Sequence, residues 1–270
     1  MLQKQLQQKQ IIKWYCVLFY ALLVFKLFNG KLLFQIQPIF FSVKMDMVTY
    51  LLLLINPHRI LLNNPIAWLI LDICFYSMPF IYFTIYKYKE RFITITAIIM
   101  LLINVLYIQL YILYSLDSIE IQIAWLLFPI LFLTKKETSF YLLANGLRYY
   151  FLFLFTSAAI WKFTQHGIFN VQQFSNILVI QHKEILTSQF TAYQKFICWL
   201  INHSSISYFL YVAGCLLELF FIVGYFTKKY DWLLAMATIG FLVFDYALMR
   251  IIYFDWLPFL LLLYYKPKSK

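Results

Sequence analysis

Residues 92–113 read FITITAIIMLLINVLYIQLYIL, an apolar run without a charged side chain. A helix of about 20 such residues crosses the roughly 30 Å hydrocarbon core of a bilayer. Runs of similar length and composition follow at residues 140–161, 206–226 and 232–252. Of the 270 residues, 64% are hydrophobic and 12% are charged, so the chain is more apolar than one soluble core requires. The sequence therefore predicts an all-α integral membrane protein.

The apolar segments predict about eight transmembrane helices in a single membrane domain of residues 1–270. A soluble β-sandwich is excluded, because it needs frequent turn signals and the chain has only six glycines. The intervals 31–64 and 167–205 are expected to be outer loops. The expected spans are 12–28, 65–86, 92–114, 121–133, 140–166, 206–226, 232–253 and 257–265.

The net charge of +11 comes from short basic clusters between the apolar segments. Cytoplasmic loops are enriched in Lys and Arg, so the clusters predict that both chain ends lie in the cytoplasm. The expected partner is the lipid bilayer, and a bacterial inner membrane is favoured over an organellar one. Nucleic-acid binding is not expected, because the basic residues do not gather on one polar helix. The clusters contain Lys4, Lys9 and Lys13; Lys87, Lys89 and Arg91; Lys135 and Lys136; Lys228 and Lys229; and Lys266, Lys268 and Lys270.

The second outer loop contains a helix signal of its own. Asn170 is a suitable N-cap, with Gln173 three residues later. Phe174, Leu178 and Ile185 then recur at helical spacing. We expect an amphipathic helix over residues 170–187 that lies on the outer face of the membrane.

Two oppositely charged residues are expected at the same depth in the bilayer. Arg148 and Glu218 lie about eight and nine residues from the inner ends of their spans, at about 1.5 Å per residue. An unpaired charge in hydrocarbon costs several kcal/mol. We therefore predict an Arg148–Glu218 ion pair that holds the two spans together.

A second group of ionisable residues is expected in the outer half of the membrane. Asp72 and Asp245 lie below the outer surface, at a level that Arg250 can reach. His182 falls on the apolar face of the expected outer helix, which can place it over the same pocket. These four residues are the predicted substrate pocket, and a buried structural role is the alternative for His182.

Lys162 is the candidate catalytic residue. It follows Arg148 by fourteen residues, a spacing that returns a helix to within about 40° of the same face. His166 comes one helical turn later. A lysine in partly dry surroundings beside a histidine can act as a catalytic acid or base. In the alternative, Lys162 only extends its amine to the outer interface.

The spacing of histidines and cysteines does not indicate a metal site. The four histidines form no HxxxH pair, and the four cysteines form no CxxC pair. No metal is expected, and the cysteines are interpreted as buried structural thiols.

The segments LRYY at residues 147–150 and SAAIWKF at residues 157–163 resemble a small-residue helix that ends in a lysine in DoxX-like and HTTM-like membrane proteins. SNIL at residues 175–178 and FTKKYD at residues 226–231 are similar to the same group, so the resemblance covers about residues 140–256. The HTTM-like group includes vitamin K-dependent carboxylase. The resemblance implies that Lys162 is a base acting on reduced vitamin K. The DoxX-like relatives imply quinone-linked sulfur or thiol oxidation, or maturation of a periplasmic dehydrogenase.

Two functions of different classes stay open. In the first, the chain is a non-catalytic component or assembly factor of a larger membrane complex, with other subunits as partners, and its charges serve helix packing. In the second, the chain is a membrane enzyme or redox subunit that acts on a quinone or another lipid-soluble substrate. Lys162 and His166 are its catalytic candidates.

Overall fold

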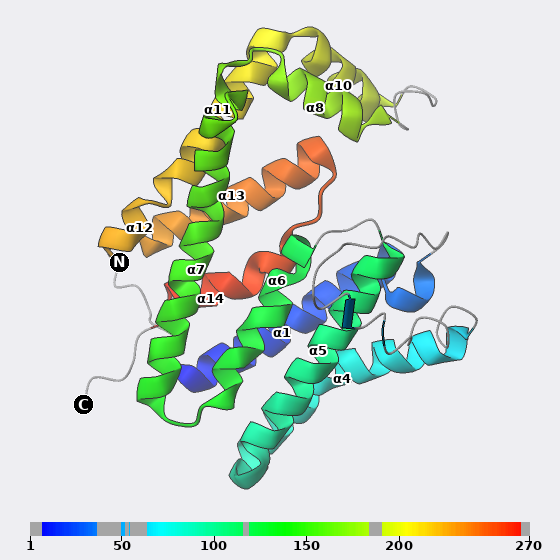
Figure 1. Ribbon diagram of the computed structural model, residues 1–270, viewed down its shortest axis with the longest axis vertical. Helices are drawn as coiled ribbons and strands as arrows, with labels where there is room; N and C mark the ends of the chain where they lie inside the picture. The colour runs from blue at the N-terminus through cyan, green and yellow to red at the C-terminus, as the bar shows by residue number, and fades with distance from the viewer. Residues whose placement is uncertain are drawn as a thin grey trace. The chain divides into compact units, whose positions relative to one another are not determined.

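The computed structural model describes residues 7–36, 50–51, 54, 64–115, 119–183 and 191–265 (Figure 1). The regular structure among these residues is helical, which confirms the all-α prediction. The chain divides into two compact units: unit 1 contains residues 1–147 and 254–270, and unit 2 contains residues 148–253. The single membrane domain stays a prediction, and most of the expected outer loop 31–64 lies outside the described residues.

Unit 1 combines helices from both ends of the chain. The last helix, α14, packs against α1 and α6, which come much earlier in the sequence. The helix α7 begins in unit 1 and continues into unit 2. The elements of unit 1 are α1 (Gln8–Phe28), η1 (Leu33–Gln35), α4 (Pro65–Tyr88), η2 (Glu90–Phe92), α5 (Ile93–Tyr114), α6 (Ile119–Leu127), η3 (Phe128–Leu133), the first part of α7 (Glu137–Thr164), η5 (Phe254–Trp256) and α14 (Leu257–Leu263).

Unit 2 has its core among α8, α10, α11 and α13, where Leu178, Ile197 and Cys215 are almost fully buried. The expected amphipathic helix 170–187 corresponds to α8, which ends earlier, and residues 184–190 lie outside the described part. A second amphipathic helix, α10, packs against α8. The elements of unit 2 are the second part of α7, η4 (Gly167–Phe169), α8 (Gln173–Gln181), α10 (Ala192–Asn202), α11 (Ser204–Phe220), α12 (Val223–Phe226) and α13 (Asp231–Met249).

Five helical segments are long and apolar enough to cross a membrane, and they match five of the eight expected spans. Two further expected spans correspond to shorter apolar segments, Ile119–Leu133 and Phe254–Leu263. The eighth is α7, which is long enough but contains the polar residues Asn145, Arg148 and Lys162. Eight crossings and the cytoplasmic position of both ends stay predictions. The five segments are Gln8–Gln35, Pro65–Tyr88, Ile93–Tyr114, Ser204–Phe226 and Asp231–Met249.

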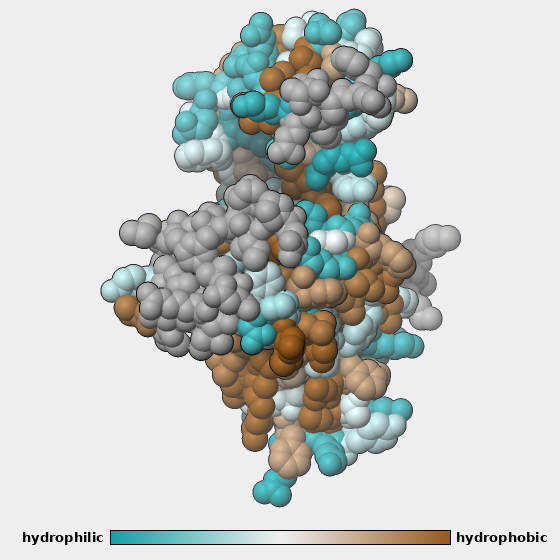
Figure 2. All heavy atoms as spheres, turned by 90° about the vertical axis from the view of Figure 1, so that its right-hand side faces the viewer, coloured by the Kyte–Doolittle hydropathy of each residue, from teal (hydrophilic) through white to brown (hydrophobic). Residues whose placement is uncertain are grey.

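These helices leave much apolar surface uncovered. In the five segments, only 28% to 50% of the most apolar window is buried within the chain. Figure 2 shows hydrophobic side chains gathered on the face of unit 1 formed by α4 and α5, where Ile70, Phe80 and Leu102 are exposed. Water-soluble monomers rarely expose apolar patches larger than a few hundred Å². The surface is therefore compatible with a protein that faces lipid.

Helix α4 is fixed to α1 at the turn that contains Pro79. Proline has no backbone N–H, so the helical hydrogen-bond ladder is weakened there. The hydroxyl of Tyr20 on α1 donates to the carbonyl of Tyr76 at 2.9 Å and accepts from the N–H of Phe80 at 3.2 Å. One side chain of α1 thus bridges two backbone groups of α4, and it sets how these helices pack.

An aromatic cluster fills the centre of unit 1. The ring of Tyr15 is stacked on that of Phe128, with centroids 5.0 Å apart, and it meets the edge of Trp125 at 5.4 Å. Phe19 makes an edge-on contact with the same Trp125 at 4.7 Å. Offset and edge-to-face pairs of this kind add stabilisation beyond the burial of their area. This cluster joins α1 to α6 and η3.

Candidate functional site

A cavity of about 100 Å³ lies in unit 2 between α7, α8, α11 and α13. Three ionisable residues from three different helices line it: Lys162 on α7, Glu218 on α11 and Asp245 on α13. The rest of the lining is aromatic, aliphatic or small and consists of Phe174, Ile177, Leu210, Tyr211, Gly214, Phe241, Phe244 and Met249.

Helical periodicity explains how these side chains reach one cavity. On α13, Phe241, Asp245 and Met249 recur every four residues, so they share one face of the helix. On α11, Gly214 and Glu218 have the same spacing. Each of these two helices therefore presents one carboxylate within a stripe that is otherwise uncharged.

Lys162 and Glu218 form an ion pair at the cavity wall. The amine Nζ of Lys162 donates to Oε1 of Glu218 at 2.5 Å. The Lys162 side chain is 30% exposed, whereas that of Glu218 is 2% exposed. The second carboxylate oxygen of Glu218, Oε2, is buried and has no hydrogen-bond partner within the described part of the chain. Glu218 therefore keeps one acceptor oxygen for another molecule.

Asp245 is the second carboxylate of the cavity, and its residue is 7% exposed. Within the described residues, no hydrogen bond or ion pair joins its side chain to a neighbour. The charged groups that act on it are Lys162 and Glu218. The cavity thus contains two carboxylates and one amine, and the amine is already bonded to Glu218.

The predicted Arg148–Glu218 ion pair is wrong. Arg148 is bound instead to Asp231, with Nε at 3.0 Å from Oδ2 and Nη2 at 2.5 Å from Oδ1. Nη2 also donates to the carbonyl of Gly224 at 2.9 Å. The prediction counted depth from the inner end of each span, but the turn between α11 and α13 meets α7 at Arg148. Glu218 lies on α11 before this turn, and its partner there is Lys162.

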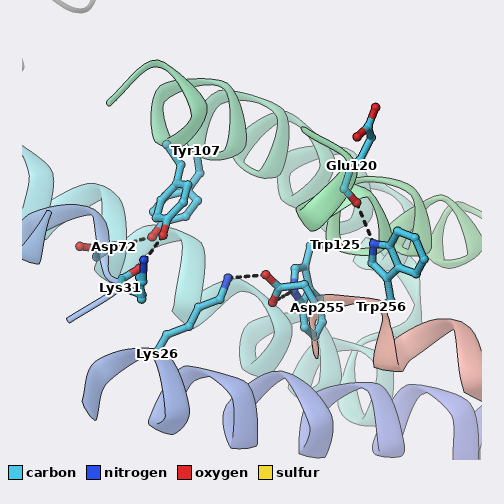
Figure 3. Close-up of polar contacts among 9 residues, drawn as sticks. Lys26, Lys31, Asp72, Tyr107, Glu120, Trp125, Asp255 and Trp256 are labelled. Atoms are coloured by element: carbon cyan, nitrogen blue, oxygen red, sulfur yellow. Dashed lines mark hydrogen bonds and ion pairs between the residues drawn. The ribbon is translucent and has the colours of Figure 1, made fainter. Parts of the chain in front are cut away.

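Asp72 does not line the cavity, because its contacts are those of a structural residue in unit 1. Its carboxylate accepts hydrogen bonds from the backbone N–H groups of Leu33 and Phe34, at 3.2 and 2.9 Å. It also accepts one from the hydroxyl of Tyr107 at 2.6 Å (Figure 3). Leu33 and Phe34 begin the short helix η1. Asp72 therefore caps η1 and joins it to α4 and α5.

Arg250 of the predicted pocket is also outside the cavity lining. It adopts a left-handed backbone conformation with φ of 56° and ends α13 at Met249, four residues before the expected end of that span. Its guanidinium lies 4.2 Å from the ring centre of Tyr193 on α10. Arg250 comes directly after Met249, so it does not share the four-residue spacing of the stripe that leads to the cavity.

The two histidines of the prediction have different surroundings. His182 is buried, and its Nε2 lies 2.6 Å from the carbonyl of Leu248, so it connects the end of α8 to α13 and does not line the cavity. His166 is exposed and adopts a left-handed conformation with φ of 57° after α7 has ended. The helical spacing that would have placed His166 above Lys162 is therefore absent.

A polar cluster in unit 1 was missed by the sequence analysis. Lys26 on α1 forms an ion pair with Asp255 at 2.8 Å, and the indole Nε1 of Trp125 donates to the same carboxylate at 2.6 Å (Figure 3). The indole of Trp256 donates to the carbonyl of Glu120 at 2.7 Å. Lys26 and Asp255 each border an apolar run, but only the return of the chain end to α1 brings them together.

No protein-family model, curated protein or solved structure significantly matches the chain. The resemblance to DoxX-like and HTTM-like proteins stays a prediction based on residues 140–256. The function must therefore be argued from the chemistry of the unit 2 cavity.

Proposed function

We propose that this chain is a multi-span integral membrane protein that binds a lipid-soluble molecule in the unit 2 cavity and exchanges a proton with it. The supporting observation is the convergence of Lys162, Glu218 and Asp245 in a cavity whose other walls are mostly aromatic or aliphatic. Ionisable residues inside membrane spans are costly, and they commonly mark substrate or proton paths. A membrane enzyme or redox subunit that acts on a quinone or another lipid-soluble substrate needs such a site.

The proposed chemistry uses the Lys162–Glu218 pair. A proton can pass along the hydrogen bond from Nζ to Oε1, which leaves a neutral amine that accepts a proton from the substrate. When Nζ has returned this proton to the bound molecule, Oε1 returns its own proton to Nζ and the ion pair is restored. Tyr211 closes this side of the cavity, since its ring centre lies 5.8 Å from Nζ. His166 has no part in the proposal, because it is exposed and outside the cavity lining.

The proposed setting is a bacterial inner membrane, with both chain ends in the cytoplasm and about eight crossings. The alternation of basic clusters along the sequence supports this topology. Membership of the DoxX-like and HTTM-like group is proposed from the residues of α7 that end in Lys162.

Native mass spectrometry of the protein released from membranes tests the bound molecule. We expect the wild type to retain one lipid-soluble molecule and Lys162→Met to lose it. Lys162→Arg, which keeps the charge next to Glu218, should retain part of the binding. Phe209→Leu, an exposed position on α11 outside the cavity lining, is the control and should match the wild type. A wild type that retains nothing, or a Lys162→Met variant that retains as much, contradicts the proposal.

A second candidate is a non-catalytic component of a larger membrane complex. Three buried or partly buried ion pairs support it, because Arg148–Asp231, Lys26–Asp255 and Lys162–Glu218 all join different helices. Such pairs can serve helix packing alone. Blue-native electrophoresis of gently solubilised membranes tests this candidate. A larger assembly that is lost in Lys162→Met supports a structural role, whereas migration of the wild type as a single chain contradicts it.

A further inference from the structure

We propose that the unit 2 cavity receives an alkylated ammonium group, with Asp245 as its counter-ion. This inference rests on the binding part of the proposed function and not on the proton exchange, because it names the chemistry of the group that the cavity binds. It favours an ammonium-bearing amphiphile over a quinone.

The lining of the cavity has more acidic than basic side chains. Glu218 and Asp245 are 2% and 7% exposed, so both carboxylates are largely removed from solvent. Lys162 is the one cation among the lining residues, and its amine bonds to Glu218. A buried charge without a partner is strongly unfavourable, so an ionised Asp245 requires a cation that the described lining does not supply. A cationic ligand would meet this need.

Glu218 has a second carboxylate oxygen that Lys162 does not bind. Its Oε2 atom is buried without a hydrogen-bond partner among the described residues, although Glu218 lines the cavity. This oxygen shares the negative charge of the carboxylate, and a nearby cation stabilises that charge without donating a hydrogen bond. A ligand that adds positive charge between Asp245 and Glu218 would favour both carboxylates, whereas an anionic ligand would be repelled by them.

Aromatic side chains form part of the cavity lining. Four rings line the cavity: Phe174 on α8, Tyr211 on α11, and Phe241 and Phe244 on α13. Aromatic faces attract cations, and cages of several rings next to a carboxylate are a known way to bind alkylated ammonium groups. Methyl groups on the nitrogen also suit apolar walls better than the three N–H donors of a primary amine, which would need more acceptors.

The small volume indicates that the cavity holds a head group and not a whole lipid. A volume of about 100 Å³ fits a few heavy atoms. The rest of the ligand would extend from the cavity, between apolar helices. The ammonium group could belong to a membrane lipid with a choline head group or to a free lipophilic amine.

Binding of hexyltrimethylammonium to the full chain in maltoside micelles tests the inference by titration calorimetry. Hexan-1-ol and hexanoate are the neutral and anionic controls of similar chain length. We expect hexyltrimethylammonium to bind about ten-fold more tightly than hexan-1-ol, and hexanoate not to bind. Equal binding of hexyltrimethylammonium and hexan-1-ol would overturn the inference.

Variants locate the binding site. Asp245→Asn keeps the shape of the side chain and should weaken binding of hexyltrimethylammonium about ten-fold, without changing the binding of hexan-1-ol. Phe244→Leu removes one ring at similar volume and should weaken binding of hexyltrimethylammonium about three-fold. Phe209→Leu, an exposed residue outside the lining, is the matched control and should change neither. An Asp245→Asn protein that binds the ammonium as tightly as the wild type overturns the inference.

The outcomes separate this inference from the proposed function. If hexan-1-ol binds in the cavity and the ammonium has no advantage, a lipid-soluble ligand is supported and the ammonium is excluded. If no probe binds, both are contradicted. The source of the group follows from nanodiscs of two zwitterionic lipids: weaker apparent binding of the probe in phosphatidylcholine than in phosphatidylethanolamine, which lacks N-methyl groups, supports a lipid head group. Equal binding supports a free amine.

Discussion

At the residue scale, the Arg148–Asp231 pair is a buried and bidentate contact of unit 2. The side chains are 2% and 4% exposed, and two hydrogen bonds connect the guanidinium to the carboxylate. Bidentate geometry of this kind is specific to arginine. Removing one partner leaves a buried charge alone, whereas removing both leaves none.

Arg148→Met should therefore destabilise the protein by about 3–5 kcal/mol. The double variant Arg148→Met/Asp231→Leu should lose clearly less, because no charge is left unpaired. Unfolding in mixed micelles, followed by circular dichroism, measures both losses. Arg91→Met, at an exposed position, is the control and should stay within about 0.5 kcal/mol of the wild type. A double variant that is less stable than Arg148→Met would contradict this view of the pair.

Gly224 is packed so closely by neighbouring leucines that there is no room for a side chain. A Cβ at this position would lie 2.7 Å from Leu152 Cδ2 and 2.8 Å from Leu234 Cδ1, closer than real Cβ atoms approach. Gly224→Ala should therefore cost about 1–3 kcal/mol through overpacking. Gly240→Ala, where a Cβ meets nothing within 4 Å, should instead be neutral or stabilising by up to about 1 kcal/mol. Melting temperatures measured under the same conditions compare the two, and equal shifts would contradict the packing argument.

The importance of buried charges was predictable from the sequence, but their pairing was not. Arg148, Lys162, Glu218 and Asp245 stand out because each interrupts an apolar run. Three of them line one cavity, whereas Arg148 lies at the hairpin turn. Counting residues from span ends failed because the turn between α11 and α13 contacts α7 at Arg148, in the interior of this helix. The spacing of residues along a helix shows which of them share a face. It does not show at what depth two different helices begin.

At the element scale, capping residues and prolines mark where a helix begins. Asn64 caps α4 through its side chain at the N–H of Ala67, and Pro65 occupies the first turn, as the sequence indicates. The end of α13 differed from the prediction, because Arg250 takes a left-handed conformation that glycine or asparagine usually occupies. No local signal in the sequence marked this end.

The short helix η1 depends on a residue of another element. Asp72 on α4 accepts from both Leu33 and Phe34, so Asp72→Asn should lose the charge-assisted part of these bonds. We expect amide exchange of residues 32–36 to become at least about ten-fold faster, while exchange in α13 stays unchanged. Hydrogen–deuterium exchange followed by mass spectrometry measures both regions. Unchanged protection of residues 32–36 would show that Asp72 does not hold η1.

At the scale of the whole molecule, the amino-acid composition was enough to predict the all-helical fold class. The five long apolar helices were recognisable, because a span needs only length and apolar character. The return of α14 to α1 and α6 could not be predicted, because it depends on side-chain packing between distant parts of the sequence. The Lys26–Asp255 pair is a consequence of this return.

The number of crossings depends on which segments cross in addition to the five long apolar ones. With eight crossings, the turn at Lys135 lies in the cytoplasm, because both the segment 119–133 and α7 cross. If only the five long apolar segments cross, the same turn lies outside. The turns at Lys89 and Lys229 are cytoplasmic in both arrangements, and Asn202 is outside in both.

Labelling of single cysteines in intact cells tests most directly that the chain crosses the membrane in this way. The native residues Cys16, Cys74, Cys198 and Cys215 are first replaced by alanine, and Lys89→Cys, Lys135→Cys, Lys229→Cys and Asn202→Cys are introduced one at a time. A membrane-impermeant maleimide should label only Asn202→Cys until the cells are opened, and then all four. Labelling of Lys135→Cys alone among the three lysine positions would exclude crossings by the segment 119–133 and by α7, and would leave at most six. Labelling of Lys89→Cys or Lys229→Cys in intact cells would contradict the proposed topology.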